Sequence, residues 1–449
     1  MAAAAPVGLR AAAVSLLRAQ GRAMALVQTM LAQGGLMALN FATGVLTARL
    51  LGPDGRGAFA AIGLWLMIPS LLASAGMQTA LIFEGGKAPD RRLPATAAAL
   101  LLTTLLFVPL ALACLPLIHW LLRAWPMHVV TAAEAAMLLS VVNVWVVIAR
   151  SHLLAGRAYG HFNAFVVSFT LLYLLALLAL AVLHQLTPTT AIAAQIATTA
   201  AMLAAWLPEL ARGWRGLRLR HVAEMIRPLA SYARRAAIAD VVSALSSQLD
   251  AMVLVALIAP RELGLYVAAF AFAKLLSVIQ AALSSILLAD LAGRPPPEVT
   301  AFLDRSFRLL LWFLVVGCVG LLAVDRLLLT TVYGADFAEA APVFRFLLVD
   351  AALSCLGSLL SQALLALDAP ASTSRAQGIA FGVTTVSMLV LAPLFGAMGA
   401  AGARAFGSGV RLALLFGALP DAGLAAPGFY LRRSDLLALR RLLPREGTA

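Results

Sequence analysis

The sequence contains few charged residues and almost no lysine. Of its 449 residues, 12% are charged and 62% are hydrophobic, whereas soluble proteins carry about 25% charged residues. A soluble chain of this size could not hide so much apolar surface, because a large share of its residues would remain in contact with water. The composition therefore excludes a soluble enzyme, a nucleic-acid-binding protein and a secreted disulfide scaffold.

Residues and motifs typical of catalytic, redox or metal sites are also scarce. The three cysteines, Cys114, Cys318 and Cys355, stand alone within apolar runs, and the six histidines show no ligand spacing. The sequence contains no Walker A motif, no HExxH and no GxSxG, so it offers neither an ATPase site nor a hydrolase site. We therefore predict no disulfide, no metal, no cofactor and no enzymatic activity.

Twelve apolar runs follow one another along the chain. A spanning helix needs about 20 mainly apolar residues, and the stretches between the runs are too short for a soluble catalytic domain. We therefore predict an all-α polytopic membrane protein with twelve transmembrane helices. The predicted spans are residues 24–48, 57–83, 95–121, 129–154, 161–184, 189–208, 229–258, 262–289, 302–325, 340–367, 376–395 and 397–420.

Positive charge gathers on alternate sides of these spans. The chain has 33 Lys and Arg against 20 Asp and Glu, a net charge of +13. Nearly half of the cations fall in the N-terminal segment, the loop between the second and third spans, the linker after the sixth span and the C-terminal tail. Since loops rich in Lys and Arg stay in the cytoplasm, we expect both termini to be cytoplasmic. The excess charge then reflects membrane topology and does not indicate nucleic-acid binding.

This organisation divides the chain into five parts. In the C-terminal part, residues 431–443 place Leu on one helical face and Arg on the other, a pattern typical of a helix that lies on a membrane surface. We predict a cytoplasmic amphipathic lead-in at 1–23, an N-terminal six-helix bundle at 24–208, a cytoplasmic basic linker at 209–228, a C-terminal six-helix bundle at 229–420 and a cytoplasmic basic tail at 421–449.

Two short loops repeat one another. LLGPDGRGAFAA at 50–61 aligns without gaps onto LIAPRELGLYVA at 257–268. The first loop joins the first two predicted spans, and the second joins the seventh and eighth. This placement predicts two pseudo-symmetric six-helix halves related by a parallel repeat around a central cavity, with the solute path between them.

Polar side chains line one face of seven predicted spans. Polar groups are costly inside a bilayer, so such faces are expected to meet one another or a wet cavity, although small polar residues also serve helix packing. The ionisable members and two of the uncharged amide side chains are the candidates for function. They are Asp240, Asp250, Lys274, Asp350, Arg150, Arg404 and Arg411, with Asn40 and Gln78.

The basic candidates predict an anion site. Fixed cations in a cavity of low dielectric attract a phosphate or pyrophosphate. Lys274 and Arg411 lie deeper in their spans than Arg150 and Arg404, whose side chains could instead reach the headgroups. We therefore expect substrate binding by Lys274, Arg411, Arg150 and Arg404, assisted by Asn40 and Gln78.

The acidic candidates predict ion coupling or gating. Asp250 and Lys274 flank the loop at 257–268 and differ in depth by roughly 6 Å along their helices, so we expect them to form an ion pair. Asp240 has no evident partner in the sequence, and an unpaired buried carboxylate suits proton coupling. Asp350 is the third acidic candidate for ion coupling or gating.

The sequence resembles bacterial polysaccharide and O-antigen flippases, which belong to the multidrug/oligosaccharidyl-lipid/polysaccharide exporter superfamily. Three stretches carry the resemblance: TARLLGPDGRGAFAAI (47–62), QLDAMVLVALIAPRELGLYVAAFAFAK (248–274) and LAPLFGAMGAAGA (391–403). It implies two six-helix bundles in a V around a central cavity, working by alternating access. It also implies a polyprenyl-pyrophosphate-linked oligosaccharide as cargo, with the prenyl tail left in the lipid at a gap beside the first and eighth spans.

These observations lead to one expected function and several alternatives. We expect a multi-pass flippase of the bacterial inner membrane that moves the lipid-linked oligosaccharide to the outer leaflet, coupled to H⁺ or Na⁺ and acting beside other polysaccharide-assembly proteins. A cation-coupled multidrug antiporter of the same fold would favour an acidic, aromatic-lined cavity, whereas aromatic residues make up 7% of this chain. A membrane glycan polymerase would need a long external loop, and lipid II flippases usually have more spans.

Overall fold

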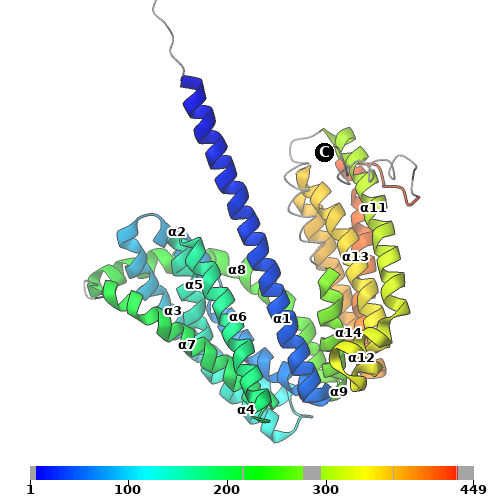
Figure 1. Cartoon of the computed structure of the whole chain (residues 1–449), viewed down its shortest axis with the longest axis horizontal. Coiled ribbons are helices and arrows are strands. Elements are labelled where there is room, and N and C mark those ends of the chain that lie inside the picture. The colour runs from blue at the N-terminus through cyan, green and yellow to red at the C-terminus, as the bar shows by residue number, and fades with distance from the viewer. Residues whose placement is uncertain (1–6, 215–216, 277–294, 368, 431, 433–449) are drawn as a thin grey trace, which may run out of the picture. The chain divides into compact units, whose positions relative to one another are not determined.

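The computed structural model describes residues 7–214, 217–276, 295–367, 369–430 and 432 (Figure 1). Within these ranges, side chains are not described at 7–33, 206–207, 209–214, 239, 242–247 and 249. Every regular element in the described ranges is a helix. The end of the eighth predicted span and the amphipathic segment at 431–443 lie outside the described residues.

Thirteen α-helices and three short 3-10 helices make up the described chain. The N-terminal half contains α1 (Val7–Ala73), α2 (Met77–Gly86), α3 (Pro89–Leu121), α4 (Met127–Leu139), α5 (Val141–Ala155), α6 (Tyr159–Val182), α7 (Pro188–Trp214) and α8 (Leu219–Leu257). The C-terminal half contains α9 (Pro260–Ala273), η1 (Lys274–Leu276), α11 (Pro296–Ala323), α12 (Asp325–Tyr333), η2 (Ala335–Ala340), α13 (Ala341–Ala366), α14 (Pro370–Ala418) and η3 (Pro420–Ala422).

All twelve predicted spans coincide with helical segments over most of their described residues. Seven helical stretches of the described chain are long and apolar enough to cross a membrane, and the longest two cover Gly34–Ala73 and Pro370–Ala422. With 40 and 53 residues, these two are about twice the length that one crossing needs. Gly34–Ala73 covers parts of the first two predicted spans, and Pro370–Ala422 contains the eleventh and twelfth. The all-helical polytopic membrane fold is confirmed.

A glycine break divides α1 into its two spans. Gly52 has a φ of 66°, a backbone conformation that residues with a Cβ rarely adopt. Across the break, the guanidinium of Arg56 donates a hydrogen bond to Thr47 Oγ1 at 2.9 Å. In an uninterrupted helix these residues would be about 13 Å apart along the axis, so the chain turns sharply at Gly52.

A second glycine break divides α14. Gly396 has a φ of 59°, and beyond it the backbone of Gly407 lies so close to Thr384 that a Cβ at position 407 would overlap the threonine hydroxyl. These two residues lie at nearly equal distances from Gly396 along the chain. The two parts of α14 therefore form an antiparallel hairpin, as the prediction of separate eleventh and twelfth spans requires.

The helices form two compact units. The first consists of Met1–Leu46, Trp65–Leu115 and Ala133–Val242, and the second consists of Thr47–Leu64, Pro116–Ala132 and Ser243–Ala449. The second unit thus includes two segments from the N-terminal half of the sequence. The boundary near residue 242 falls inside α8, whereas the predicted linker at 209–228 is helical up to Trp214 and again from Leu219.

Each unit has its own apolar core. In the first unit, α2, α3, α5 and α8 pack around Leu81, Ile148 and Leu229, and alanines on α3 let these helices approach closely. In the second unit, α11, α13 and α14 pack side by side around Phe307 and Leu360 (Figure 1).

The two repeated loops pack against each other inside the second unit. Gly57 lies against the carbonyl oxygen of Pro260, and Gly264 lies against the carbonyl oxygen of Pro53. These residues occupy equivalent positions in the aligned motifs, so each contact is the counterpart of the other, as where equivalent segments meet about a local two-fold axis. A Cβ at either glycine would overlap the opposite backbone. The reciprocal contact supports the predicted internal repeat.

A charge pair joins the same loops. Arg261 lies 3.5 Å from Asp54 and 3.1 Å from Glu339, and Asp54 and Arg261 are equivalent residues of the repeat. An identical repeat would place like charges together here, so the divergence to opposite charges makes the contact attractive. The hydrogen bonds to Glu339 also raise the pKa of Arg261 above its ordinary value.

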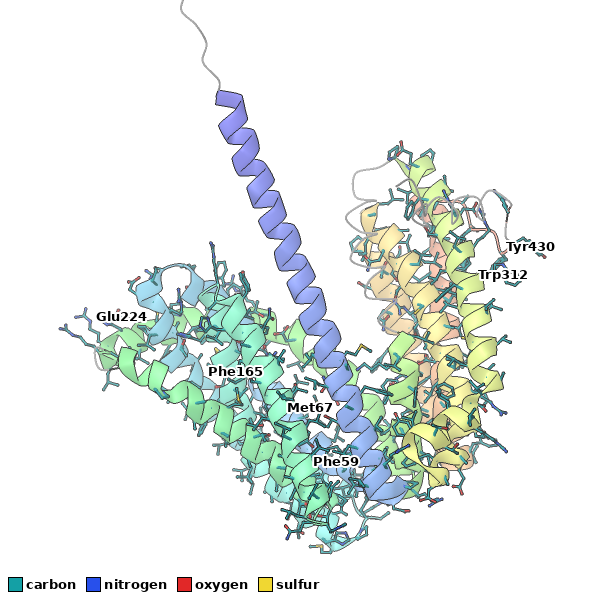
Figure 2. The ribbon with its side chains drawn as sticks, viewed as in Figure 1. Phe59, Met67, Phe165, Glu224, Trp312 and Tyr430 are labelled. Atoms are coloured by element: carbon teal, nitrogen blue, oxygen red, sulfur yellow. The ribbon has the colours of Figure 1, made fainter. Side chains whose placement is uncertain are left out.

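The segment after α14 returns along α11 in the second unit. Trp312 Nε1 donates a hydrogen bond to the carbonyl oxygen of Phe429 at 3.0 Å, and the N–H of Gly428 donates to Asp304 at 2.7 Å. Trp312 and Tyr430 lie close together at the side of α11 (Figure 2). The first residues of the predicted tail are therefore fixed to the helical unit.

Candidate functional site

A charged network connects three helices of the second unit. Arg404 on α14 forms ion pairs with Asp250 on α8 and, at 3.1 Å, with Asp350 on α13. Its guanidinium carbon also lies 5.0 Å from the ring centroid of Phe270 on α9, within the range of a cation–π contact. One arginine thus holds two carboxylates and an aromatic ring from three other helices.

Serine hydroxyls extend the network by one helical turn. Ser408, four residues after Arg404, donates a hydrogen bond to Asp350 Oδ1. Ser354, four residues after Asp350, lies 3.2 Å from Ser408 between the two hydroxyl oxygens. Residues four apart share one face of a helix, so the polar stripes predicted on α13 and α14 face each other. Asp350 is 5% exposed, which makes these partners necessary because buried charges without partners are very costly.

A polar cavity of about 230 Å³ adjoins the network. Arg411 lines it two turns beyond Arg404 on α14, and its Nη2 donates to Ser361 Oγ at 3.3 Å. Its Nε is buried and has no hydrogen-bond partner among the described residues. Buried N–H groups are nearly always satisfied, so a ligand or water that accepts a hydrogen bond would complete Arg411.

The charges that line the cavity suit an anion at one end only. Asp250, Asp350 and Arg404 form a closed ion-paired group, whereas Arg411 has no carboxylate among its hydrogen-bond partners in the described chain. Gln377 and Thr384 on the first part of α14 add neutral polar groups to the wall. The arrangement can therefore bind one small anionic group at Arg411 and hold it with neutral donors.

The structure brings four of the nine predicted site residues together, namely Asp250, Asp350, Arg404 and Arg411. It gives Asp250 a different ion-pair partner from the one predicted, because Arg404 takes the place expected for Lys274. Lys274 lies at the end of α9 and is exposed. Depth along a helix was available from the sequence, whereas the packing of α14 between α8 and α13 was not.

Asp240 belongs to the first unit and has a backbone partner. The N–H of Gly76 donates to Asp240 Oδ2 at 2.8 Å, and Gly76 is the N-cap of α2 with a φ of 72°. The second predicted span is therefore broken between Ala73 and Met77. A partner 164 residues away leaves no local signal in the sequence.

Three further candidates also lie in the first unit. The guanidinium carbon of Arg150 on α5 is 5.1 Å from the ring centroid of Phe162 on α6, and its Nε is buried without a hydrogen-bond partner among the described residues. Asn40 and Gln78 are exposed. These residues remain candidates for substrate binding.

Sequence reasoning missed two polar residues of the cavity wall and the ring beneath Arg404. Gln377 and Thr384 lie seven residues apart, with Phe381 between them, so they share one helical face. This spacing was a usable signal. Phe270 carried no comparable signal, because an aromatic residue in an apolar span is ordinarily part of the core.

No group of three or more His, Cys, Asp or Glu side chains that could hold a metal ion occurs within the described residues. Cys114, Cys318 and Cys355 are free thiols, and Cys114 and Cys355 are buried. The ionisable groups of the candidate site are therefore arginines and aspartates, which suits binding and charge pairing.

Solved structures of transporters share this fold. The lipid II flippase MurJ in an inward closed conformation matches with a TM-score of 0.68 and 12% identity over 92% of this chain and 89% of that chain. An inward-facing multidrug resistance MATE family transporter of the MOP superfamily matches with a TM-score of 0.64 and 14% identity over 91% and 96%. A MOP superfamily transporter from Pyrococcus furiosus, described as having a binding pocket of reverse polarity, matches with a TM-score of 0.54 and 11% identity over 88% and 93%.

The sequence also matches a family model. No curated protein matches it at a significant level. The model of the family described as "Polysaccharide biosynthesis protein" covers residues 26–289, which include the first eight predicted spans and both repeated loops. Since this match extends over more than half of the 449 residues, the chain belongs to the polysaccharide biosynthesis protein family.

Proposed function

We propose that the protein is a flippase that moves a polyprenyl-pyrophosphate-linked oligosaccharide from the cytoplasmic to the outer leaflet of the bacterial inner membrane by alternating access. Family membership and a transporter fold shared with a lipid II flippase support the general activity. The identity of the oligosaccharide cargo, the direction of transport and the location in the inner membrane are part of this proposal. Arg411, with its buried and unpartnered Nε beside a polar cavity, is the observation that carries the choice of an anionic cargo.

The size of the cavity limits what it can hold. At about 230 Å³, it is smaller than the roughly 300–1,000 Å³ of sites that enclose drug-sized ligands. It can accept a phosphate-sized group but not an oligosaccharide. We therefore assign the pyrophosphate to Arg411, where charge-assisted hydrogen bonds are strongest, and leave the sugars to wider parts of the transport path.

Ion coupling requires a group whose charge changes during the cycle. The two acidic candidates of the second unit, Asp250 and Asp350, are both paired with Arg404, which favours a gating role for them. Asp240 meets only a backbone N–H among the interactions that the structure shows. We therefore assign coupling to H⁺ or Na⁺ to Asp240 in the first unit.

The test is transport by purified protein in proteoliposomes that contain the polyprenyl-pyrophosphate oligosaccharide of the source cells. Arrival of the glycan in the opposite leaflet is measured by its accessibility to an added glycosidase. We expect Arg411→Ala to slow transport by about tenfold or more, since a lost charge-assisted hydrogen bond is worth about 1.5–3 kcal/mol, and Arg411→Lys to retain part of it. Arg375→Ala, on the same helix outside the cavity, is the matched control.

Two results would contradict the proposal. Transport by Arg411→Ala at the wild-type rate would remove the pyrophosphate assignment. Proton- or sodium-driven efflux of cationic drugs, with no movement of the lipid-linked glycan, would replace the flippase with the multidrug antiporter.

A further inference from the structure

We propose that Arg404 serves as a built-in cation for Asp250 and Asp350, so that the second unit excludes exchangeable metal cations at these carboxylates. Shortening Arg404 should then turn the same oxygens into a binding site for a monovalent cation. This inference concerns the charge network alone and does not depend on which cargo the protein moves.

The geometry of the ion pairs is the first argument. The two carboxylates come from different helices, α8 and α13, and meet at different nitrogens of one guanidinium: Nη1 pairs with Asp250, and Nε pairs with Asp350. Two carboxylates brought this close would repel each other and favour protonation if no positive charge lay between them. Arg404 supplies that charge permanently, because an arginine stays protonated in proteins.

The second argument is that both carboxylate oxygens of Asp350 already have a donor. Its Oδ2 accepts from Arg404, and its Oδ1 accepts from Ser408. A metal cation at this place would have to share these oxygens with their donors while facing the positive guanidinium at short range, where like charges repel strongly in a medium of low dielectric. Wild-type protein should therefore not bind Na⁺ or K⁺ here.

The third argument is the ligand set that a shortened side chain would leave. Carboxylate oxygens of Asp250 and Asp350 and hydroxyl oxygens of Ser354 and Ser408 surround the guanidinium and line the cavity. Hard cations prefer such all-oxygen sites. The cavity of about 230 Å³ beside them offers room for the cation and its remaining water.

This inference adds a specificity-determining residue to the coupling step. While Arg404 holds both carboxylates, they change neither charge nor partner when the sodium concentration changes. The second unit then responds to movement of α14 against α8 and α13, which would break the ion pairs, and not to cation exchange. Because an arginine occupies the place of a bound ion, the coupling of transport to an ion gradient would take place outside this network.

The experiment compares thermal unfolding of the full-length protein in detergent, in 100 mM NaCl and in 100 mM choline chloride. For wild type we expect no difference between the two salts. For Arg404→Ala we expect a lower melting temperature in choline chloride and a rise of about 2–4 °C in NaCl, as a ligand at several times its Kd produces by mass action. Binding of ²²Na⁺ to the same samples gives an independent readout.

Matched variants separate a specific site from a general salt effect. Arg411→Ala removes a cation from the same cavity and helix but leaves both ion pairs of Arg404, so it should show no sodium response. Adding Asp250→Asn to Arg404→Ala should abolish the response. If Arg404→Ala cannot be purified, Arg404→Gln keeps more of the side chain than alanine and also removes the charge, and it should show the same response.

The proposal would be overturned by sodium binding to the wild type that Asp350→Asn removes. It would equally be overturned if neither Arg404→Ala nor Arg404→Gln gained a sodium response while remaining folded. Arg404→Lys provides one further check: a lysine keeps the positive charge, so this variant should resemble the wild type.

Discussion

At the scale of single residues, Asp240 illustrates how the role of a charge depends on its partner. Its carboxylate accepts the N–H of Gly76, which caps the start of α2. Helix N-termini leave backbone N–H groups without partners, and a carboxylate there also interacts favourably with the helix dipole. Asp240 therefore stabilises the break in the second span, in addition to the coupling role that we propose.

Two substitutions at Asp240 separate these roles. Asp240→Ala leaves the buried N–H of Gly76 without an acceptor, and we expect it to lower the stability of the protein by about 1–2 kcal/mol. Asp240→Asn keeps an acceptor and should cost less than half of that. Both variants should lose the acceleration of transport by an ion gradient, because neither can change its charge. Thermal unfolding measures the first effect, and transport with and without a gradient measures the second.

Asp90→Ala is the control for this pair, because Asp90 is an exposed acidic residue in the first turn of α3. It should leave gradient-dependent transport unchanged. If Asp240→Asn retained full acceleration by the gradient, Asp240 would be a structural cap only, and ion coupling would have to be sought elsewhere.

The charged network around Arg404 shows which features of the site could be predicted from the sequence and which could not. Helical spacing correctly placed Asp350, Arg404, Ser408 and Arg411 on polar faces, because periodicity along one helix is a local property. The choice between Lys274 and Arg404 as a partner depends on which helices pack together, and that information is not local. A resemblance over short stretches gave the family but not the contacts.

At the scale of elements, the reciprocal contact of the repeated loops gives a sharp test. Position 57 faces the backbone of Pro260, and position 264 faces the backbone of Pro53. Backbone atoms cannot move aside as a flexible side chain can, so we expect Gly57→Ala and Gly264→Ala each to destabilise the protein by about 2–3 kcal/mol, the upper part of the range for overpacking. Thermal unfolding and the amount of folded protein in the membrane measure the loss.

The control is Gly378→Ala, because nothing lies within 4 Å of a Cβ at Gly378. Alanine also favours a helix over glycine, so this variant should be as stable as the wild type or slightly more stable. The two loop variants should have similar effects, since their contacts are counterparts, and the double variant should cost less than the sum because both act on one contact. A neutral effect of either loop variant would show that the loops do not meet in the membrane.

The elements themselves were largely predictable. Apolar runs of about 20 residues fall on helices throughout the described chain, because a bilayer imposes this length on every crossing. Two of the three breaks were predicted as well: Gly52 lies in the predicted loop between the first two spans, and Gly396 lies between the predicted eleventh and twelfth spans. Gly76, which interrupts the second predicted span, was not predicted. Glycines with positive φ are common at such breaks, but a glycine within an apolar run equally permits close helix packing.

At the scale of the whole molecule, the distribution of arginine predicts the orientation of the protein in the membrane. The net charge of +13 is concentrated in loops that alternate along the chain, and positively charged loops are retained in the cytoplasm. The loop before α3 and the start of α14 should therefore face the cytoplasm. The loops after α3 and after α6 should face the outside.

Single cysteines test this orientation in a variant whose three native cysteines are replaced by alanine. Asp90→Cys and Ser374→Cys should react with a membrane-impermeant maleimide only in inverted membrane vesicles. Ala124→Cys and Gln185→Cys should react in spheroplasts with an intact membrane. All four residues are exposed, so burial in the protein would not account for a lack of labelling, and labelling after the membrane is dissolved in detergent provides the control.

The direction of transport depends on this result. If Asp90→Cys and Ser374→Cys were labelled from the outside, the arginine-rich linker and both termini would lie outside the cytoplasm, and the cargo would meet the protein from the opposite leaflet. The long basic segment could then serve a membrane glycan polymerase, which requires an external loop. With the expected labelling, a lipid-linked anion made in the cytoplasm would approach the side where loop arginines are concentrated, where their field raises its local concentration, before it reaches Arg411.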